Sequence, residues 1–142
     1  MLKVNMNVLI DTNVILDAVM TRTPHHVSAE KLFLLTAEDK LNAAITASSV
    51  TDIYYLLYKY LHDADQTKQV LLKLFGLFEV LDVTGSDCEK ALSMPMNDYG
   101  DALLATCAKR RKLDLIITRN LKDFAESPIK AIAPDDFLAN YF

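Results

Sequence analysis

The sequence predicts an α/β protein in which helices cover both faces of a mostly parallel sheet, a three-layer α/β/α sandwich. Short runs rich in Val, Ile and Leu alternate along the chain with longer segments of helical periodicity. Strands separated by helices form parallel sheets whose two faces the helices bury. The length of 142 residues suits one domain of ordinary size, so we expect residues 1–142 to fold as a single one.

The expected strands are short apolar runs that end at polar residues. The first covers residues 4–10 and ends at Asp11, after which residues 13–20 have a helical pattern. The remaining elements are expected as a helix over 25–39, a strand over 41–46, a helix capped by Ser48 or Ser49 that continues to about 61, a helix over 66–74 capped by Asp65, a strand over 78–83, a helix over 86–94, a helix from Asp98 to about 112, a strand over 114–118 and a helix over 134–141.

Composition excludes several classes of protein. Hydrophobic residues make up 51% of the chain and charged residues 24%, which is too apolar for a disordered chain. The apolar run near the N-terminus is too short for a signal peptide or a membrane span, so we expect a cytoplasmic protein without membrane contact. Cys88 and Cys107 lack the spacing of a disulfide scaffold or a zinc site and are expected to be buried.

Net charge bears weakly on the function. The formal value of -4 argues mildly against a protein that coats nucleic acid nonspecifically. It does not exclude an enzyme that meets phosphate groups through bound metal.

Acidic residues fall where a parallel sheet places its ligand sites. Asp11 directly follows the first expected strand, and Thr118 and Asn120 directly follow the strand over 114–118. If these two strands are neighbours at the point where the strand order reverses, these residues face one crevice. Two further acids, Asp52 and Asp101, are expected in the first turns of helices that begin at the same end of the sheet.

Carboxylates that converge in this way require protons or a cation. Two like charges about 4 Å apart repel by roughly 4 kcal/mol at an effective dielectric constant of about 20. Oxygen ligands without Cys or His favour Mg²⁺ or Mn²⁺ over zinc. Such a metal lowers the pKa of bound water and stabilises the charge on a phosphate in transit. The chemistry implied is phosphodiester hydrolysis.

Four segments resemble, in the correct order, the motifs of PIN domains. They are VLIDTNVILDAV, SSVTDIYYLL with its acid, NDYGDALLATCAKRR and LIITRNLKDF. PIN domains of this size are typically metal-dependent ribonucleases, many of them VapC-type toxins of toxin–antitoxin pairs. The resemblance implies that Asp11, Asp52 and Asp101 are catalytic metal ligands. It also implies RNA as the substrate, an antitoxin protein as a partner and a homodimer.

Two positions depart from the family pattern. The second acidic position is often Glu and is Asp52 here, which is one methylene shorter. The residue after Thr-Arg in the last motif is often Asp and is Asn120 here, which keeps a carbonyl oxygen but loses the charge. Asp123, three residues later, supplies the missing carboxylate if its loop turns inward, and is otherwise a surface residue. The number of metals bound therefore stays open.

Helix capping is the alternative role for several of these acids. Asp11 and Asp98 each stand where an N-cap is expected. Asp52 stands three residues after Ser49, which is the spacing of a capping box. Asp98 is therefore either a direct or water-mediated metal ligand or the N-cap of the helix that carries Asp101.

Basic and hydroxyl side chains are the candidates for binding the substrate. Arg119 and Lys122 are expected to contact phosphate, and Thr118 to place its hydroxyl near the metal ligands. Arg22 is a similar candidate. The basic run at 109–112 ends a helix, where it is either a solvated helix end or a further phosphate-contacting patch.

Three other features are expected to be structural. Asp17 is predicted on a solvated helix face, and His25 and His26 have no third ligand at metal spacing. The tyrosines within residues 54–60 are expected mostly to pack along their helix, or else to form a dimer or antitoxin surface.

Two other functions remain open on the sequence. A phosphatase or receiver-type domain would use Asp11 as a phosphate acceptor, but Asn13 stands where such phosphatases need a second acid, and no acid precedes Asp11. A PIN fold that has lost catalysis and serves as a binding scaffold is kept open by Asn120.

Overall fold

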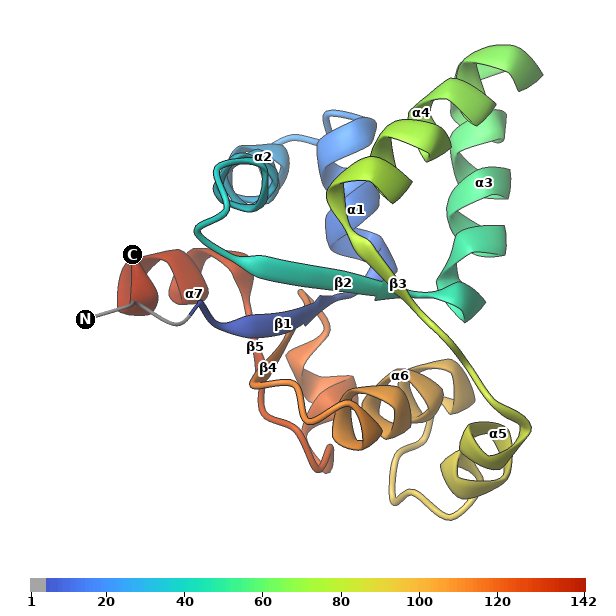
Figure 1. The fold of residues 1–142 in the computed structure, drawn as a ribbon, viewed down its shortest axis with the longest axis vertical. Helices are drawn as coiled ribbons and strands as arrows, with labels where there is room; N and C mark the ends of the chain where they lie inside the picture. Colours follow the sequence, from blue (N-terminus) through green and yellow to red (C-terminus); the bar gives the residue numbers. More distant parts are fainter. Residues whose placement is uncertain (1–4) are drawn as a thin grey trace.

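In the computed structural model, which describes residues 5–142, a five-stranded parallel sheet separates two layers of helices (Figure 1). The strand order is β3-β2-β1-β4-β5, and all four pairings are parallel. The predicted three-layer α/β/α sandwich is confirmed. The elements follow one another as β1 (Asn7–Ile10), α1 (Thr12–Val19), α2 (His26–Ala37), β2 (Asn42–Thr46), α3 (Ala47–Leu61), α4 (Ala64–Leu77), β3 (Glu79–Leu81), α5 (Gly85–Ala91), α6 (Tyr99–Arg110), β4 (Leu115–Ile117), the 3-10 helix η1 (Leu121–Phe124), β5 (Ala131–Ile132) and α7 (Pro134–Tyr141).

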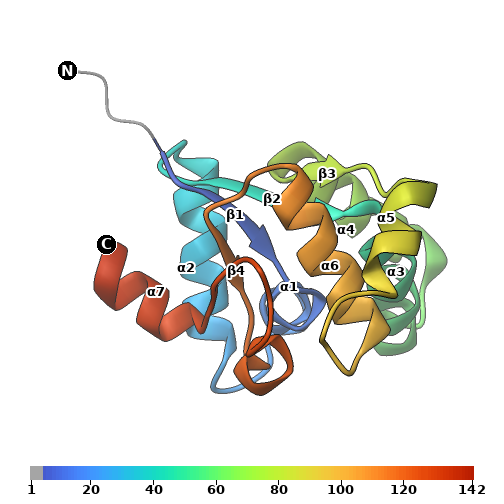
Figure 2. The same cartoon turned by 90° about the horizontal axis from the view of Figure 1, so that it is seen from below.

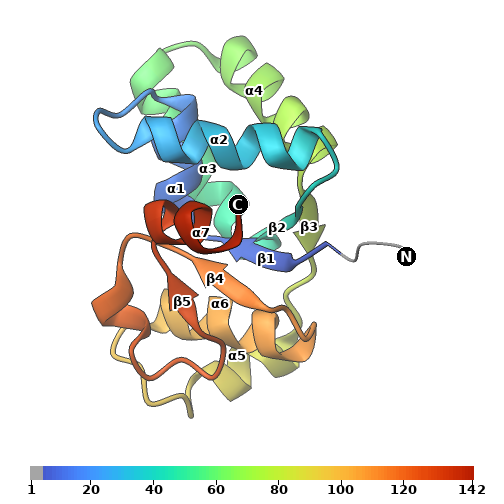
Figure 3. The ribbon, with the colours of Figure 1, turned by 90° about the vertical axis from the view of Figure 1, so that its left-hand side faces the viewer.

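Alternating side chains of the central strands build two cores, one on each face of the sheet. Val8 and Ile10 of β1 point into the larger core, together with side chains from α1, α2, α3, α4 and α7. Leu9, between them, points into the smaller core, where it packs with residues of α6. Figure 3 shows the resulting layers, with α1 to α4 on one side of the sheet and α5 and α6 on the other. Burial on both faces explains why β1 reads as an unbroken apolar run.

The start of α3 differs from the prediction. Its N-cap is Thr46, the last residue of β2, and not Ser48 or Ser49. Both serines lie in the first turn, with their hydroxyls 2.8 and 2.9 Å from the Thr46 hydroxyl. The helix begins directly after the strand, so Asp52 lies in the second turn and the proposed capping box with Ser49 is wrong.

The start of α4 also differs, because Asp63 is its N-cap and not Asp65. The Asp63 carboxylate accepts a hydrogen bond of 2.9 Å from the backbone N–H of Gln66. Asp65 lies within the first turn instead, where a negative charge complements the helix dipole. Asp63 and Asp65 are only two residues apart, so the sequence alone did not show which of them caps α4.

Most other boundaries lie within two residues of the prediction, and α7 matches it at both ends. However, α4 ends at Leu77 instead of residue 74, and α5 at Ala91 instead of residue 94. The short elements η1 and β5 were not predicted, since a four-residue and a two-residue element have too little periodicity to recognise. Residues 1–4, which include the predicted start of the first strand, lie outside the described part. Within residues 5–142, no helix combines the length and apolarity needed to cross a bilayer.

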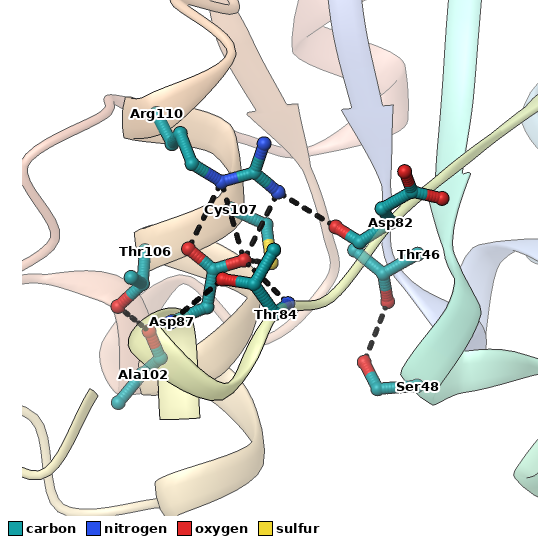
Figure 4. A network of polar contacts seen from close by, with 9 residues as sticks. All are labelled: Thr46, Ser48, Asp82, Thr84, Asp87, Ala102, Thr106, Cys107 and Arg110. Carbon is teal, nitrogen blue, oxygen red and sulfur yellow. Dashed lines mark hydrogen bonds and ion pairs between the residues drawn. The ribbon is translucent and has the colours of Figure 1, made fainter. Parts of the chain in front are cut away.

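A buried carboxylate ties α5 to the C-terminal end of α6 (Figure 4). Asp87 is only 1% exposed and forms a capping box with Thr84 at the start of α5. Arg110, at the end of α6, donates from Nε and Nη2 to the same carboxylate at 2.9 Å, and from Nη2 to the Asp82 carbonyl at 2.7 Å. The Arg110 hydrogen bonds and the capping contacts lower the pKa of Asp87 to about 2. This network fixes the position of α6 on the sheet.

We predict that Asp87→Asn lowers the melting temperature at pH 7 by about 5 °C, because Arg110 loses its charged partner. The pKa of Asp87 is below its ordinary value of 3.8 in the folded protein. The stability that it adds is therefore present above about pH 4 and is lost as the pH falls toward 2. Thermal melts from pH 7 to pH 2 should show wild type and variant converging.

The matched control is Glu79→Gln, which breaks the exposed pair between Glu79 and Arg111. Exposed pairs contribute little, so this change should leave the melting temperature within about 1 °C. Equal losses in both variants, or a gap for Asp87→Asn that persists at pH 2, would contradict the structural role of this carboxylate.

Candidate functional site

Asp11 lies at the centre of the sheet's carboxyl edge, where the strand order reverses. It follows β1, which pairs with β2 on one side and β4 on the other. Its backbone N–H donates to the carbonyl of Ile117, the last residue of β4, at 3.0 Å. The predicted adjacency of these two strands is therefore confirmed. Ligand sites of open α/β sheets form in the crevice at such a point.

Three hydrogen bonds reach the Asp11 carboxylate, the longest of them from Asn13 Nδ2 to Oδ2 at 3.4 Å. Oδ1 accepts from the backbone N–H of Thr12 at 2.8 Å, so Asp11 is the N-cap of α1. Oδ2 accepts from the Thr118 hydroxyl at 2.8 Å. The Thr118 oxygen in turn accepts from the backbone N–H of Asn120 at 3.0 Å, so its own proton is directed to Asp11. Asp11 is 6% exposed, so one edge of the carboxylate reaches the surface.

Thr118 was predicted to bind the substrate with its hydroxyl near the metal ligands, and the structure places that hydroxyl beside Asp11. Its side chain has an exposed fraction of 0% and is covered by the end of the sheet. A contact of Thr118 with the substrate stays a prediction.

Four acids line one cavity of about 350 Å³ at this edge of the sheet. Asp11 comes from the end of β1, Asp52 from α3, and Asp98 and Asp101 from the start of α6. The convergence expected from the sequence is thus present in the structure, while the role of each residue stays a prediction.

Ser48 and Ser49 also line this cavity, and they had been interpreted only as caps. The signal that places them there is their position directly after β2. The carboxyl end of that strand lies beside the end of β1.

The start of α6 is shaped to hold two acids close together. Asp98 is the N-cap, and its Oδ1 accepts from the backbone N–H of Asp101 at 2.9 Å. A Cβ atom at Gly100 would lie 3.1 Å from Asp98 Oδ1, which is tighter than ordinary contact. Glycine therefore lets the Asp98 carboxylate fold over the first turn. Capping by Asp98 is confirmed, and it leaves the second carboxylate oxygen available to the cavity.

Burial and neighbouring negative charges raise the pKa of two of these acids, Asp11 and Asp101. Burial and the negative charges of Asp11, Asp98 and Asp123 raise the pKa of Asp101 to about 7. Burial also raises the pKa of Asp11, although the hydrogen bonds from Thr118 and Thr12 oppose that change. Close carboxylates of this kind hold protons near neutral pH unless a cation replaces them.

The donor set fits a hard divalent cation, since the polar side chains among the described residues that line the cavity are carboxylates and hydroxyls. Within the described residues, no three Asp, Glu, His or Cys side chains are gathered closely enough to enclose an ion. Asp52 and Asp98 are exposed, so their rotamers can change without disturbing the core. A bound cation would draw these two carboxylates inward.

Asn120 and Asp123 lie at the edge of the site. The described residues that line the cavity do not include them, and both side chains are exposed. Asp123, on η1, is close enough for its charge to raise the pKa of Asp101. A contact of either residue with metal stays a prediction.

Asp17 was predicted on a solvated face, and this prediction is wrong. Its side chain is 1% exposed and lies between two arginines. Arg119 donates to it from Nε at 2.6 Å and from Nη2 at 3.1 Å, and Arg22 Nε lies 2.8 Å away. Periodicity within α1 could not reveal this burial, because the two cations arrive from the turn after α1 and from the turn after β4.

The basic run at 109–112 lies away from the acids, at the C-terminal end of α6. A helix of 12 residues is about 18 Å long, and Asp98 and Asp101 occupy its other end. Arg110 and Arg111 are ion-paired with Asp87 and Glu79. The structure therefore favours a structural helix end over a phosphate patch for these two residues. Lys122 remains exposed beside the site, on η1.

Comparison with known proteins gives both a family and similar folds. A family model described as PIN domain matches residues 7–122. The VapBC2 structure from Rickettsia felis, bound to a promoter DNA fragment, is 18% identical with a TM-score of 0.68, covering 90% of this chain and 98% of that one. A toxin–antitoxin complex from Klebsiella pneumoniae is 22% identical with a TM-score of 0.65, covering 89% and 97%.

A third similar structure is Mycobacterium tuberculosis VapC20, a toxin that cleaves the sarcin-ricin loop. It is 14% identical with a TM-score of 0.61, covering 77% of this chain and 86% of that one. At these identities the likeness shows the fold alone. No curated protein sequence matches the chain. The family model spans most of the chain, including the residues that supply the four acids of the cavity, and the chain belongs to the PIN-domain family.

Proposed function

We propose that the protein is a metal-dependent endoribonuclease and the toxin of a toxin–antitoxin pair. The observation that carries this proposal is the single cavity lined by Asp11, Asp52, Asp98 and Asp101 at the reversal point of a PIN sheet. The pKa of Asp101, raised to about 7, supports it, because carboxylates that repel one another in this way are suited to a divalent cation.

The residues of the cavity have distinct roles under this proposal. Asp11 and Asp101, the two less exposed acids, hold the cation, and Asp52 and Asp98 complete its coordination or bind its water. Mg²⁺ or Mn²⁺ at this place would supply positive charge to the scissile phosphate and lower the pKa of a water molecule. The hydrogen bond from Thr118 lowers the pKa of Asp11, against the rise caused by burial, and orients its carboxylate. Asn120 and Asp123 are proposed to lie in the outer coordination shell of the cation, where they would contact its bound water.

Arg119 and Lys122 are proposed to bind the RNA backbone. Arg119 is held by Asp17 with 31% of its side chain exposed, so its guanidinium is both fixed and accessible. Fixed cations lose little conformational entropy when they bind phosphate.

An antitoxin and a second copy of the chain are the proposed protein partners. The Klebsiella pneumoniae structure of similar fold is a toxin–antitoxin complex. In this protein, α3 and α4 expose several large apolar side chains, which is the composition of a protein interface. These side chains are Tyr55, Leu56, Tyr58, Leu72 and Phe75. A reducing cytoplasm suits both the RNA substrate and the free cysteines Cys88 and Cys107.

A binding scaffold without catalysis is the second candidate. The observations that favour it are Asn120 in place of an acid and the absence, among residues 5–142, of three gathered ligands. The experiments below distinguish the two functions, since a scaffold should neither cut RNA nor bind Mn²⁺ at this cavity.

Cleavage of structured and single-stranded RNAs by the purified protein tests the proposed function. We expect cutting with Mg²⁺ or Mn²⁺, none with EDTA, and at least about a 100-fold loss in Asp11→Asn, which removes a charge at the reacting phosphate. Asp136→Asn, which changes an exposed acid on α7, is the control and should cut like wild type. Equal cutting by Asp11→Asn and wild type would reject the assignment of this cavity.

The pH dependence of stability provides a second test that needs no substrate. The folded pKa of Asp101 is raised from 3.8 to about 7, so its stabilising contribution is complete below about pH 4 and is lost as the pH rises through 7. We expect the metal-free protein to melt at a lower temperature at pH 8 than at pH 5. Mn²⁺ should raise the melting temperature more at pH 8, where protons no longer compete.

Asp101→Asn should flatten this pH dependence and remove the response to Mn²⁺. Asp136→Asn should change neither. A pH profile that is the same in wild type and Asp101→Asn would show that this carboxyl does not titrate as the structure implies.

The orientation of Asp11 by Thr118 predicts a third result. Thr118→Val keeps the shape but removes the hydroxyl, and we expect kcat to fall about tenfold with little change in KM. Thr106→Val is the matched control, since the buried Thr106 hydroxyl donates to the Ala102 carbonyl within α6 and away from Asp11. The orienting role is wrong if both valine variants reduce kcat equally.

A further inference from the structure

A second cavity, of about 390 Å³, opens between the start of α2, the start of α7 and the turn after β4. Figure 2 shows α2 and α7 side by side, with β4 next to them. The residues used in the argument below are Pro24, His25, Ser28, Arg119, Pro134 and Asp135, all of which line this cavity. None of the sequence motifs pointed to it.

Arg119 connects this cavity to the four acids. Its neighbour in the chain, Thr118, donates to Asp11, and the positive charge of Arg119 acts on the Asp11 carboxylate. The Arg119 side chain itself lies in the wall of the second cavity. Arg119 therefore acts on an acid of one cavity and lines the other.

The Asp17 carboxylate holds the Arg119 guanidinium in place. It accepts two hydrogen bonds from Arg119, and Arg22 pairs with its other side. Arg22 also donates from Nη2 to the carbonyl of Asn13 at 2.9 Å, which anchors the cluster to α1. A buried carboxylate between two arginines leaves the cluster with one net positive charge at the cavity wall.

The lining of the cavity combines the groups that recognise a nucleotide. Pro24 and Pro134 offer flat apolar surface, Arg119 and His25 offer N–H donors, and Asp135 offers an acceptor beside the Ser28 hydroxyl. The base of a nucleotide can lie on the apolar surface with its N–H groups toward Asp135, while the phosphate of the same nucleotide points toward Arg119. The volume is at the lower end of the range for ligand pockets, about 300–1,000 Å³, which suits one nucleotide.

We propose that this cavity is a subsite for one unpaired nucleotide of the RNA, next to the scissile phosphate, and that Asp17 is the residue that positions Arg119 on the backbone. This inference rests on the proposed ribonuclease function. The base must be unpaired because a base held in a duplex cannot enter a cavity between two helices.

Binding of a fluorescein-labelled 12-nucleotide single-stranded RNA, measured by anisotropy in EDTA so that no cleavage occurs, tests the subsite. Ser28→Trp fills the cavity and should weaken binding about tenfold, the loss of one base contact. Val27→Trp is the matched control: it adds the same bulk at an exposed position of α2 that does not line the cavity. It should bind within about twofold of wild type.

The positioning role of Asp17 has a separate readout in the salt dependence. Arg119→Ala should reduce the slope of log Kd against log salt by about 0.7, the value for one phosphate of a single strand. Asp17→Asn should reduce it similarly, and should have no further effect in the Arg119→Ala background. Should Asp17→Asn fail to fold, the comparison of Ser28→Trp with Val27→Trp still decides the subsite.

The outcomes separate this inference from the proposed function. If wild type cuts RNA but Ser28→Trp binds and cuts like Val27→Trp, the subsite is wrong and the nuclease stands. If Asp17→Asn weakens binding by the same factor with and without Arg119, Asp17 does not act through Arg119. If wild type neither cuts nor binds RNA, the proposed function fails and the subsite with it.

Discussion

The pairing of β1 with β2 on one side and β4 on the other is the constraint on which the candidate site depends. It brings the ends of two strands that are 107 residues apart into hydrogen-bonding contact, so that Thr118 can donate to Asp11. The reversal of strand order at β1 opens a crevice at that edge, because the connections on its two sides leave toward opposite faces. Helix α3 places Asp52 at the same cavity, and the start of α6 places Asp98 and Asp101 there.

The rest of the molecule holds these helices in position. On one face, α6 is packed through small and apolar side chains against the sheet, and its far end is tied to α5 by the pair of Arg110 with Asp87. On the other face, α3 begins directly at the end of β2, so that Thr46 links strand and helix without a loop. The repulsion among the acids is therefore imposed by a rigid scaffold, and a cation is the natural means of relieving it.

Local pattern was enough to predict the fold and the four acids, because each signal lies within a few residues. Apolar runs ending at Asp11 and after Ile117 marked the strands, and the ordered motifs placed Asp52 and Asp101. Contacts between distant segments could not be predicted in this way. Asp17 looked like a surface residue of α1, and its burial depends on Arg119, 102 residues later in the chain. The cavity between α2 and α7 depends in the same way on tertiary packing and had no signal in the sequence.

The central claim is that the four acids form a divalent-metal site, and a Mn²⁺ titration followed by electron paramagnetic resonance tests it most directly. Our account predicts saturable binding to the wild-type protein at pH 8. It also predicts that Asp11→Asn and Asp101→Asn each weaken this binding at least about tenfold, whereas Asp136→Asn does not change it. Undetectable binding to the wild type, or binding that both cavity variants retain unchanged, would contradict the account and favour a catalytically silent scaffold.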